Sequence, residues 1–126
     1  MKLDRRLNIL IYLNQNWADH NGGHLELWDK NMKNCEKKIL PIFNRMVIFN
    51  TTDFSFHGNP NKINIPDKSK SRKSIALYYY SNGRPDNERS AKDHTTLWKN
   101  RPNTSDTKKN TIYKKIFWKI YYKLKL

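Results

Sequence analysis

The apolar run RLNILIYLN, residues 6–14, constrains the fold of this chain more than any other stretch. It is rich in β-branched and aromatic residues, which is typical of a strand. Because side chains alternate along a strand, the run has two apolar faces. One face holds Leu7, Ile9, Ile11 and Leu13, and the other holds Leu10 and Tyr12. A strand that is apolar on both faces is expected to be buried on both sides.

Three further segments are predicted to be strands: His24–Trp28, which follows a double glycine, about Arg45–Asn50, and Ser74–Ser81. No stretch before residue 85 has a helical period. Short strands joined by loops containing Gly, Pro and Asn predict a mainly β fold, which is an antiparallel sandwich, jelly roll or barrel. Four or five strands leave open edges and half-covered faces, so we expect part of the fold to be missing.

The C-terminal third differs from the rest in charge and in period. Residues 86–111 are polar and are predicted to be a loop or linker, whereas residues 112–126 have the period of a basic amphipathic helix. Two interpretations of this tail stay open, a helix that packs on the sheet and an interfacial helix that binds anionic membranes. The net charge of +14 favours nucleic acid or an acidic membrane as a partner, and half of it lies in residues 86–126.

The single cysteine, Cys35, cannot form an internal disulfide, which fits a cytoplasmic protein. It lies in the segment KNCEKK, which is predicted to be an exposed polar loop whose lysines can lower the pKa of the thiol. No nucleophile motif surrounds this cysteine. Glycine-rich phosphate loops and zinc-finger spacing are also lacking in the sequence. We therefore predict no residue for nucleophilic catalysis.

Iron binding by two histidines and a carboxylate is the chemistry that the remaining residues allow. His24-Leu25-Glu26 is a literal His-x-Glu pair, and His57 is the distant histidine that such a site requires. The alternative places His24 and Glu26 on the solvent face of a strand whose leucines point inward. Spacing alone does not decide between the two interpretations.

Four ordered segments carry a resemblance to a known family. They are RRLNILIYLNQNW, NGGHLELWD, ILPIFNRMVIFNTTDFSFHG and RKSIALYYYSNGRP, all within residues 5–85. In sequence and order they resemble the Fe(II)/2-oxoglutarate dioxygenases, specifically bacterial members of the prolyl 4-hydroxylase-like subgroup. The resemblance implies that residues 1–85 are part of a double-stranded β-helix, or jelly-roll, domain, with Fe(II), 2-oxoglutarate and ascorbate as cofactors.

The resemblance also implies roles for individual residues. His57 corresponds to the distal iron ligand, and Arg72 to the basic residue that pairs with the distal carboxylate of 2-oxoglutarate. Tyr12 and Leu25 correspond to residues that line the cosubstrate pocket, and this alignment turns His24 and Glu26 away from the pocket. The interval between His57 and Arg72 is long, so Lys70 or Lys73 can replace Arg72 if the register shifts.

Two of the three expected iron ligands are not found in the chain. In the family a His-x-Asp motif precedes the segment that corresponds to KLDRRLN, which here starts at Lys2. We therefore expect an N-terminally truncated domain with little hydroxylase activity of its own. An intact member acts on O2 and a peptidyl or small-molecule substrate. The alternative function is a non-enzymatic binding module that contacts nucleic acid or anionic membrane through residues 108–126.

Overall fold

The computed structural model describes residues 3–67, 69–89, 99–104 and 106. The chain divides into two compact units, Met1–Thr95 and Thr96–Leu126. In the described part of the second unit, the guanidinium of Arg101 forms an ion pair with Asp106 at 2.7 Å. The predicted helix over residues 112–126 lies outside the described residues, as does the whole of the proposed binding segment 108–126. The part of the chain that the structure describes has no helix with the length and apolarity needed to cross a bilayer.

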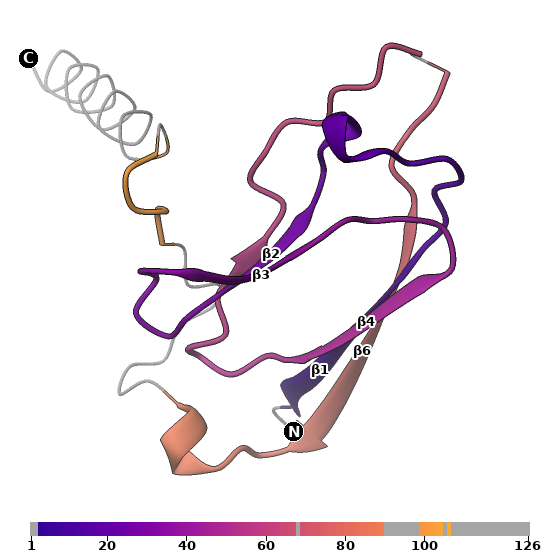
Figure 1. The fold of residues 1–126 in the computed structure, drawn as a ribbon. Coiled ribbons are helices and arrows are strands. Elements are labelled where there is room, and N and C mark those ends of the chain that lie inside the picture. The colour runs from indigo at the N-terminus through magenta and orange to yellow at the C-terminus, as the bar shows by residue number, and fades with distance from the viewer. Residues whose placement is uncertain (1–2, 68, 90–98, 105, 107–126) are drawn as a thin grey trace, which may run out of the picture. The chain divides into compact units, whose positions relative to one another are not determined.

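The first unit contains two three-stranded antiparallel sheets among its described residues (Figure 1). In sheet A the central strand β1 (Leu3–Tyr12) lies between β4 (Arg45–Asn50) and β6 (Ser74–Asn82). These three strands confirm the three predicted for this part of the fold. The bounds of β4 are those predicted, β6 ends one residue later, and β1 begins and ends earlier than predicted.

In sheet B the central strand β2 (Leu25–Trp28) lies between β3 (Cys35–Ile39) and β5 (His57–Gly58). The strand predicted at His24–Trp28 is therefore confirmed to within one residue. The strand β3 corrects our prediction of a polar loop around Cys35. Its sequence, CEKKI, has no apolar alternation, and charged side chains are common on edge strands because they discourage pairing with other chains.

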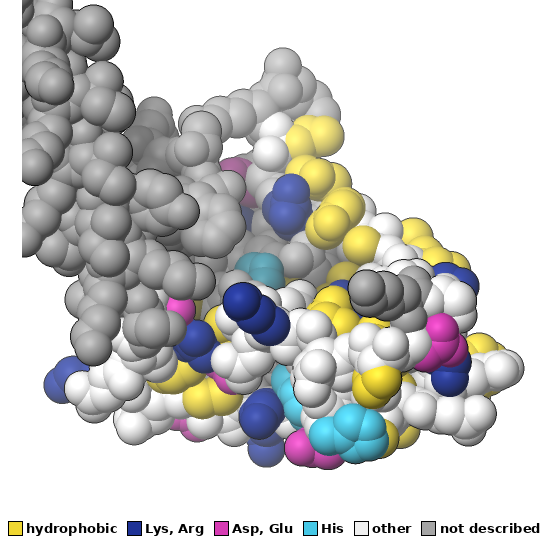
Figure 2. Space-filling model, turned by 90° about the horizontal axis from the view of Figure 1, so that it is seen from above, with side chains coloured by type: hydrophobic (Ala, Val, Ile, Leu, Met, Phe, Trp, Pro, Cys, Tyr) yellow, Lys and Arg dark blue, Asp and Glu magenta, His cyan; other side chains and the backbone are white. Residues whose placement is uncertain are grey.

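Side chains on the facing sides of the two sheets form a small core. Tyr12 from β1 and Leu25 from β2 are 0% and 2% exposed, and Trp17 is also buried. The opposite, outer face of sheet A is apolar but largely open, which corrects the expectation that β1 is buried on both sides. Its half-exposed side chains on the flanking strands are Met46, Ile48, Ile75, Leu77 and Tyr79. Figure 2 shows hydrophobic side chains that reach the surface in this way.

The end of sheet A at the start of β1 is tied to the short 3-10 helix η2 (Asp86–Glu88). The guanidinium of Arg6 forms an ion pair with Glu88 at 2.9 Å. The backbone N–H of Asp53 donates to the carbonyl of Glu88. Residues 86–89, predicted to be the start of a linker, are therefore attached to the sheet.

Candidate functional site

The double glycine before β2 allows the segment between His57 and Arg72 to lie against it. Gly22 and Gly23 have φ of +70° and +68°, a region that side chains disfavour. A Cβ on Gly22 would lie 2.6 Å from the carbonyl oxygen of Lys62. One on Gly23 would lie 2.9 Å from Cδ of Arg72. The close approach of backbone at Gly22 and of the Arg72 side chain at Gly23, together with the positive φ at both, therefore favours glycine.

Arg72 is held over Tyr12 at this turn. Its Nε donates to the carbonyl of Gly23 at 2.9 Å, and its Cζ lies 5.0 Å from the centre of the Tyr12 ring. Because Nε is used in this way, the terminal guanidinium nitrogens are left for another acceptor. Lys70 and Lys73, the predicted substitutes for Arg72, are both exposed.

The hydroxyl of Tyr12 is buried and lacks a hydrogen-bond partner among the described residues. Burial raises the pKa of Tyr12 above its ordinary value of 10.0, and the nearby positive charge of Arg72 partly opposes the rise. Buried polar groups in folded proteins are nearly always hydrogen-bonded. The guanidinium of Arg72 also approaches this hydroxyl closely enough for a side-chain interaction that lowers the pKa of Tyr12, and because a guanidinium can only donate, the O–H of Tyr12 stays available to donate to a ligand.

Asn14, which we did not predict as a site residue, fixes the backbone next to Arg72. Its side-chain oxygen accepts from the N–H of Lys73 at 2.5 Å, and its Nδ2 donates to the carbonyl of Pro41 at 2.7 Å. The sequence signal that could have identified Asn14 is its position, as a polar residue just after the end of β1. Its amide joins three separate segments at the end of the sheet where Arg72 lies.

His57 is oriented by its neighbours as a metal-ligating histidine would be. Its Nδ1 lies 2.8 Å from the carbonyl oxygen of Ser55, which can only accept, so Nδ1 carries the proton. In that neutral tautomer Nε2 keeps a lone pair that is available to a metal ion. The ring meets Phe49 edge-on, with centroids 4.7 Å apart, and the side chain is exposed.

The literal site His24, Glu26 and His57 does not form. His57 pairs with Leu27 in the register of β2 and β5, so its side chain shares the face of Leu27. Glu26 lies on the opposite face, and so does His24 by alternation. The described residues contain no group of three His, Cys, Asp or Glu that could hold a metal ion.

Burial of His24 and Glu26 corrects the expectation that they face solvent. Nε2 of His24 lies 3.0 Å from a carboxylate oxygen of Asp19. The indole N–H of Trp28 donates to Glu26 at 3.0 Å. Both side chains are thus satisfied within the fold, since loops fold over this face of β2. The expectation that these side chains face solvent was based only on their polarity, whereas both are buried.

The Cys35 thiol differs from our prediction in chemistry as well as in structure. Desolvation and the nearby carboxylate of Glu26 raise the pKa of Cys35, whereas the sequence suggested that lysines lower it. The side chain is exposed, and Sγ lies 3.4 Å from the carbonyl oxygen of Lys37. A thiol with a raised pKa is a poor nucleophile at neutral pH.

Arg72 and His57 contact the inner face of sheet A at different positions along β1. On β1, four residues separate Tyr12, which Arg72 covers, from Asn8, which lies opposite Phe49 beside His57. In the segment that leads into β2, Gly23 likewise precedes Leu27 by four positions. At about 3.4 Å per residue, each interval is about 14 Å.

The side chain of Leu25 stands midway along β2 between these two ends. The facing sheets therefore present a guanidinium and a hydroxyl at one end, an imidazole at the other, and an apolar residue between them. Arg72 and Tyr12 have the chemistry to hold a carboxylate. His57 supplies one ligand for a metal ion. The residues present thus fit 2-oxoglutarate well and fit Fe(II) in part.

An imidazole and a guanidinium in this arrangement have the chemistry that a protein binding a metal ion and a dicarboxylate would need. The family model described as 2OG-Fe(II) oxygenase superfamily matches residues 1–80, and the chain belongs to that superfamily. Membership implies the use of Fe(II), 2-oxoglutarate and O2 with an organic substrate. Comparison with the curated proteins and with the solved structures finds no match for this chain.

Proposed function

We propose that this chain supplies the 2-oxoglutarate-binding end and the distal iron ligand of a prolyl 4-hydroxylase-like dioxygenase with a jelly-roll core. The observation that carries the proposal is the guanidinium of Arg72 held over Tyr12, whose buried hydroxyl has no partner among the described residues. That pair forms one end of the facing sheets, and His57 forms the other.

Each residue has a specific role in this proposal. The terminal nitrogens of Arg72 donate to the distal carboxylate of 2-oxoglutarate, and the hydroxyl of Tyr12 donates a further hydrogen bond to it. Leu25 excludes water from the methylene chain. Nε2 of His57 binds Fe(II), and the Ser55 carbonyl keeps that ring in the required tautomer. With iron bound at this site, O2 would supply the oxidising power for hydroxylation, 2-oxoglutarate would be oxidised to succinate and CO2 in the same reaction, and ascorbate would maintain Fe(II).

The remaining ligands are proposed to come from outside these 126 residues. The sequence contains no His-x-Asp, and its one His-x-Glu is divided from His57 by the plane of sheet B. Among the described strands, β6 is an edge of sheet A and β5 is an edge of sheet B. Added strands can pair with these edges, next to both Arg72 and His57. The chain alone is therefore expected to have little hydroxylase activity.

The carboxylate site is tested by titrating the chain with 2-oxoglutarate and, separately, with 2-oxobutyrate, which lacks the distal carboxylate. Binding is followed by NMR shifts. We expect 2-oxoglutarate to bind and 2-oxobutyrate to bind at least tenfold more weakly, because the bidentate ion pair is lost. Arg72→Gln should remove the preference, and the exposed control Lys70→Gln should keep it. Equal binding of both acids to the unaltered chain would contradict the proposal.

The expected lack of turnover is tested by measuring succinate formed from 2-oxoglutarate with Fe(II), ascorbate and O2. We expect the chain alone to give no succinate above a control without protein, since one imidazole fixes neither the affinity nor the geometry of Fe(II). Production of succinate that is lost in His57→Ala would show that the chain holds a complete iron site.

A further inference from the structure

The outer face of sheet A is an apolar surface that neither the iron site nor the carboxylate site uses. It is made of three cross-strand rows, each with one residue from β4, one from β1 and one from β6. The rows are Met46, Ile11 and Ile75; Ile48, Ile9 and Leu77; and Asn50, Leu7 and Tyr79. None of the nine side chains is charged, and all except that of Asn50 are apolar or aromatic. The face therefore offers a partner apolar contact without charge.

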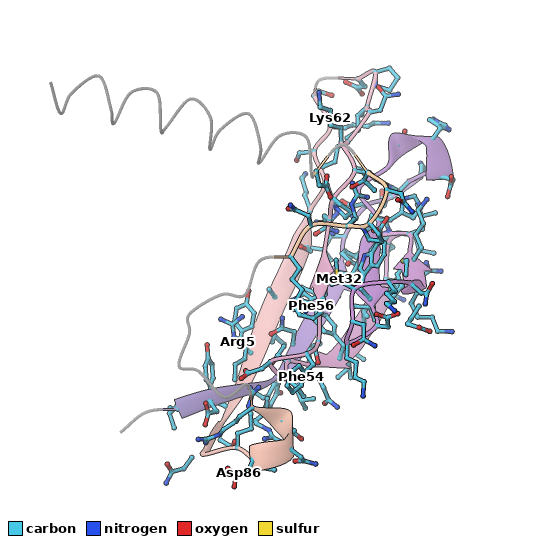
Figure 3. All side chains as sticks on the ribbon, turned by 90° about the vertical axis from the view of Figure 1, so that its left-hand side faces the viewer. Arg5, Met32, Phe54, Phe56, Lys62 and Asp86 are labelled. Atoms are coloured by element: carbon cyan, nitrogen blue, oxygen red, sulfur yellow. The ribbon has the colours of Figure 1, made fainter. Side chains whose placement is uncertain are left out.

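Two arginines of sheet A lie on its other face. Arg45 pairs with Tyr12 and Arg5 pairs with Tyr80, so both arginines share the inner face. The guanidinium of Arg5 lies 4.4 Å from the centre of the Tyr78 ring, and Figure 3 shows Arg5 beside the long strand β6. A nucleic acid or an anionic membrane needs cations on the surface that it contacts. The uncharged outer face therefore favours an apolar partner, although the net charge of the chain is +14.

The exposed area of the outer face is close to what each partner of a stable dimer contributes. Five side chains on the flanking strands are between 43% and 58% exposed, namely Met46, Ile48, Ile75, Leu77 and Tyr79. A large side chain that is half exposed leaves about 100 Å² open. With the partly exposed residues of β1, the three rows leave about 700 Å² open. A standard interface buries about 800 Å² on each partner.

A flat sheet face is complementary in shape to a second copy of itself. Two sheets stack face to face about 10 Å apart, with their strands within about 30° of each other and their side chains interdigitated. A two-fold axis brings the same patch of both chains together, so one apolar patch is sufficient for the whole interface.

We propose that two copies of this chain form a symmetric dimer through the outer faces of their A sheets. Ile9, in the middle of the central row, lies at the centre of the interface. The inference does not rest on the proposed function, because Tyr12 and the guanidinium of Arg72 above it are on the inner face. The net charge of +14 on each copy opposes association. We therefore expect a weak dimer, with a dissociation constant of about 10 µM.

Sedimentation of the full chain at concentrations from about 1 to about 100 µM tests the dimer. We expect the mean mass to rise from that of one chain, 15.2 kDa, toward twice that value. Salt should strengthen the association severalfold between about 0.05 and 0.5 M, because it screens the repulsion between the two copies and leaves apolar contacts intact. A single-chain mass at every concentration would overturn the proposal. Association that weakens with salt would also overturn it, since contacts between charges would then hold the copies together.

Ile48→Lys tests which surface the two copies use. The variant should weaken association at least tenfold, because the dimer would bury an unpaired charge. Ile63→Lys is the matched control, since Ile63 lies in the loop between β5 and β6 and is 48% exposed, against 54% for Ile48. The control should keep its dissociation constant within twofold of the unaltered chain. Equal association of the two variants would overturn the proposal, and would assign the contact to a sheet edge or another surface.

Ile48→Glu separates the lost apolar contact from a change in overall charge. This variant lowers the net charge of each copy, so a dimer that is limited only by repulsion would become tighter. We expect it to weaken association about as much as Ile48→Lys does, because either charge must be buried. Tighter association of Ile48→Glu than of the unaltered chain would overturn the proposal.

Binding of a hydrophobic dye gives a second measurement that needs no variant. Dye bound per chain should be severalfold higher at about 1 µM than at about 100 µM of chain, because the dimer covers the face that the dye uses. Dye binding per chain that does not change with concentration would contradict an interface on this face.

Discussion

A few buried polar atoms in the first unit have no hydrogen-bond partner among the described residues. Among the described residues, the buried side-chain atoms without a hydrogen-bond partner are Oδ1 of Asn8, the hydroxyl of Tyr12 and Nε of Arg84. Asn8 and Tyr12 are on one face of β1, four residues apart. Folded proteins rarely leave such atoms unpaired, because each costs about 1–3 kcal/mol. Two such atoms therefore lie on the same strand face, and the hydroxyl of Tyr12 is the one assigned to 2-oxoglutarate in the proposed function.

Tyr12→Phe should weaken 2-oxoglutarate binding severalfold and change stability at neutral pH by less than about 1 kcal/mol, because the hydroxyl that is removed is buried and interacts only with the guanidinium of Arg72 among the described residues. Stability should also depend less on alkaline pH. The folded pKa of Tyr12 is raised, so the unfolded chain loses this proton first. Its contribution to stability is complete below about pH 10 and is lost as the pH rises through 10 toward the folded pKa.

Urea unfolding at a series of pH values from about 8 to 11 measures this dependence. Tyr79→Phe, an exposed position, keeps the number of tyrosines equal and should retain the alkaline loss of the unaltered chain. The same loss of stability in Tyr12→Phe and Tyr79→Phe would show that Tyr12 titrates normally.

Local backbone geometry positions Arg72 at the scale of the elements. The double-glycine turn before β2 lets the segment after His57 approach closely. Asn59 donates to the carbonyls of Gly23 and His24, at 3.3 and 2.8 Å. Arg72 then reaches the Gly23 carbonyl just before β6 begins. The long interval between His57 and Arg72 is thus anchored to the turn at both of its ends, which favours Arg72 over its lysine neighbours.

Gly23→Ala should cost about 1–3 kcal/mol of unfolding free energy and weaken 2-oxoglutarate binding. The strain has two sources, the φ of +68° and the contact of the new Cβ with Arg72, and the second displaces the guanidinium. Gly83 is the matched control, because its φ is +89° and nothing lies within 4 Å of an added Cβ. Gly83→Ala should lose stability but keep its affinity. If Gly23→Ala and Gly83→Ala lost the same affinity for 2-oxoglutarate, the turn at Gly23 would not be what positions Arg72.

In the first unit, the two faces of sheet A differ in how much of their surface is exposed. The inner face is buried along β1, at Asn8 and Tyr12, but it is exposed along nearly all of β6. The outer face exposes a row of apolar side chains across three strands. Ile48 and Leu77 flank Ile9 in this row, and they are 54% and 43% exposed. Contiguous apolar surface of this kind binds apolar molecules or promotes association.

Ile48→Lys combined with Leu77→Lys should reduce the binding of a hydrophobic dye severalfold and leave 2-oxoglutarate affinity within twofold. Both positions are half exposed and lie on the face opposite Tyr12, so the site is unaffected. Gln15→Lys with Asn31→Lys adds the same charge at exposed polar positions and should leave dye binding unchanged. A similar reduction by both pairs would assign the effect to charge instead of to the outer face.

Much of the fold and of the site could be predicted where the signal is local. Runs rich in β-branched and aromatic residues, bounded by turn residues, predicted β1, β4 and β6, because such composition is a property of each strand alone. The polar strand β3 was not predicted, because its sequence has no strand pattern of its own. It is a strand because its backbone pairs with that of β2. The short strand β5 was not predicted either, since two residues carry no period.

The sequence by itself determined the strands of sheet A, the superfamily, and His57 and Arg72 as candidate ends of the site. Tertiary structure alone decided which side chains meet. Cross-strand register places His57 on the face opposite Glu26, and the turn at Gly23 brings Arg72 over Tyr12. These arrangements depend on contacts between residues far apart in the chain, and local periodicity contains no information about such contacts.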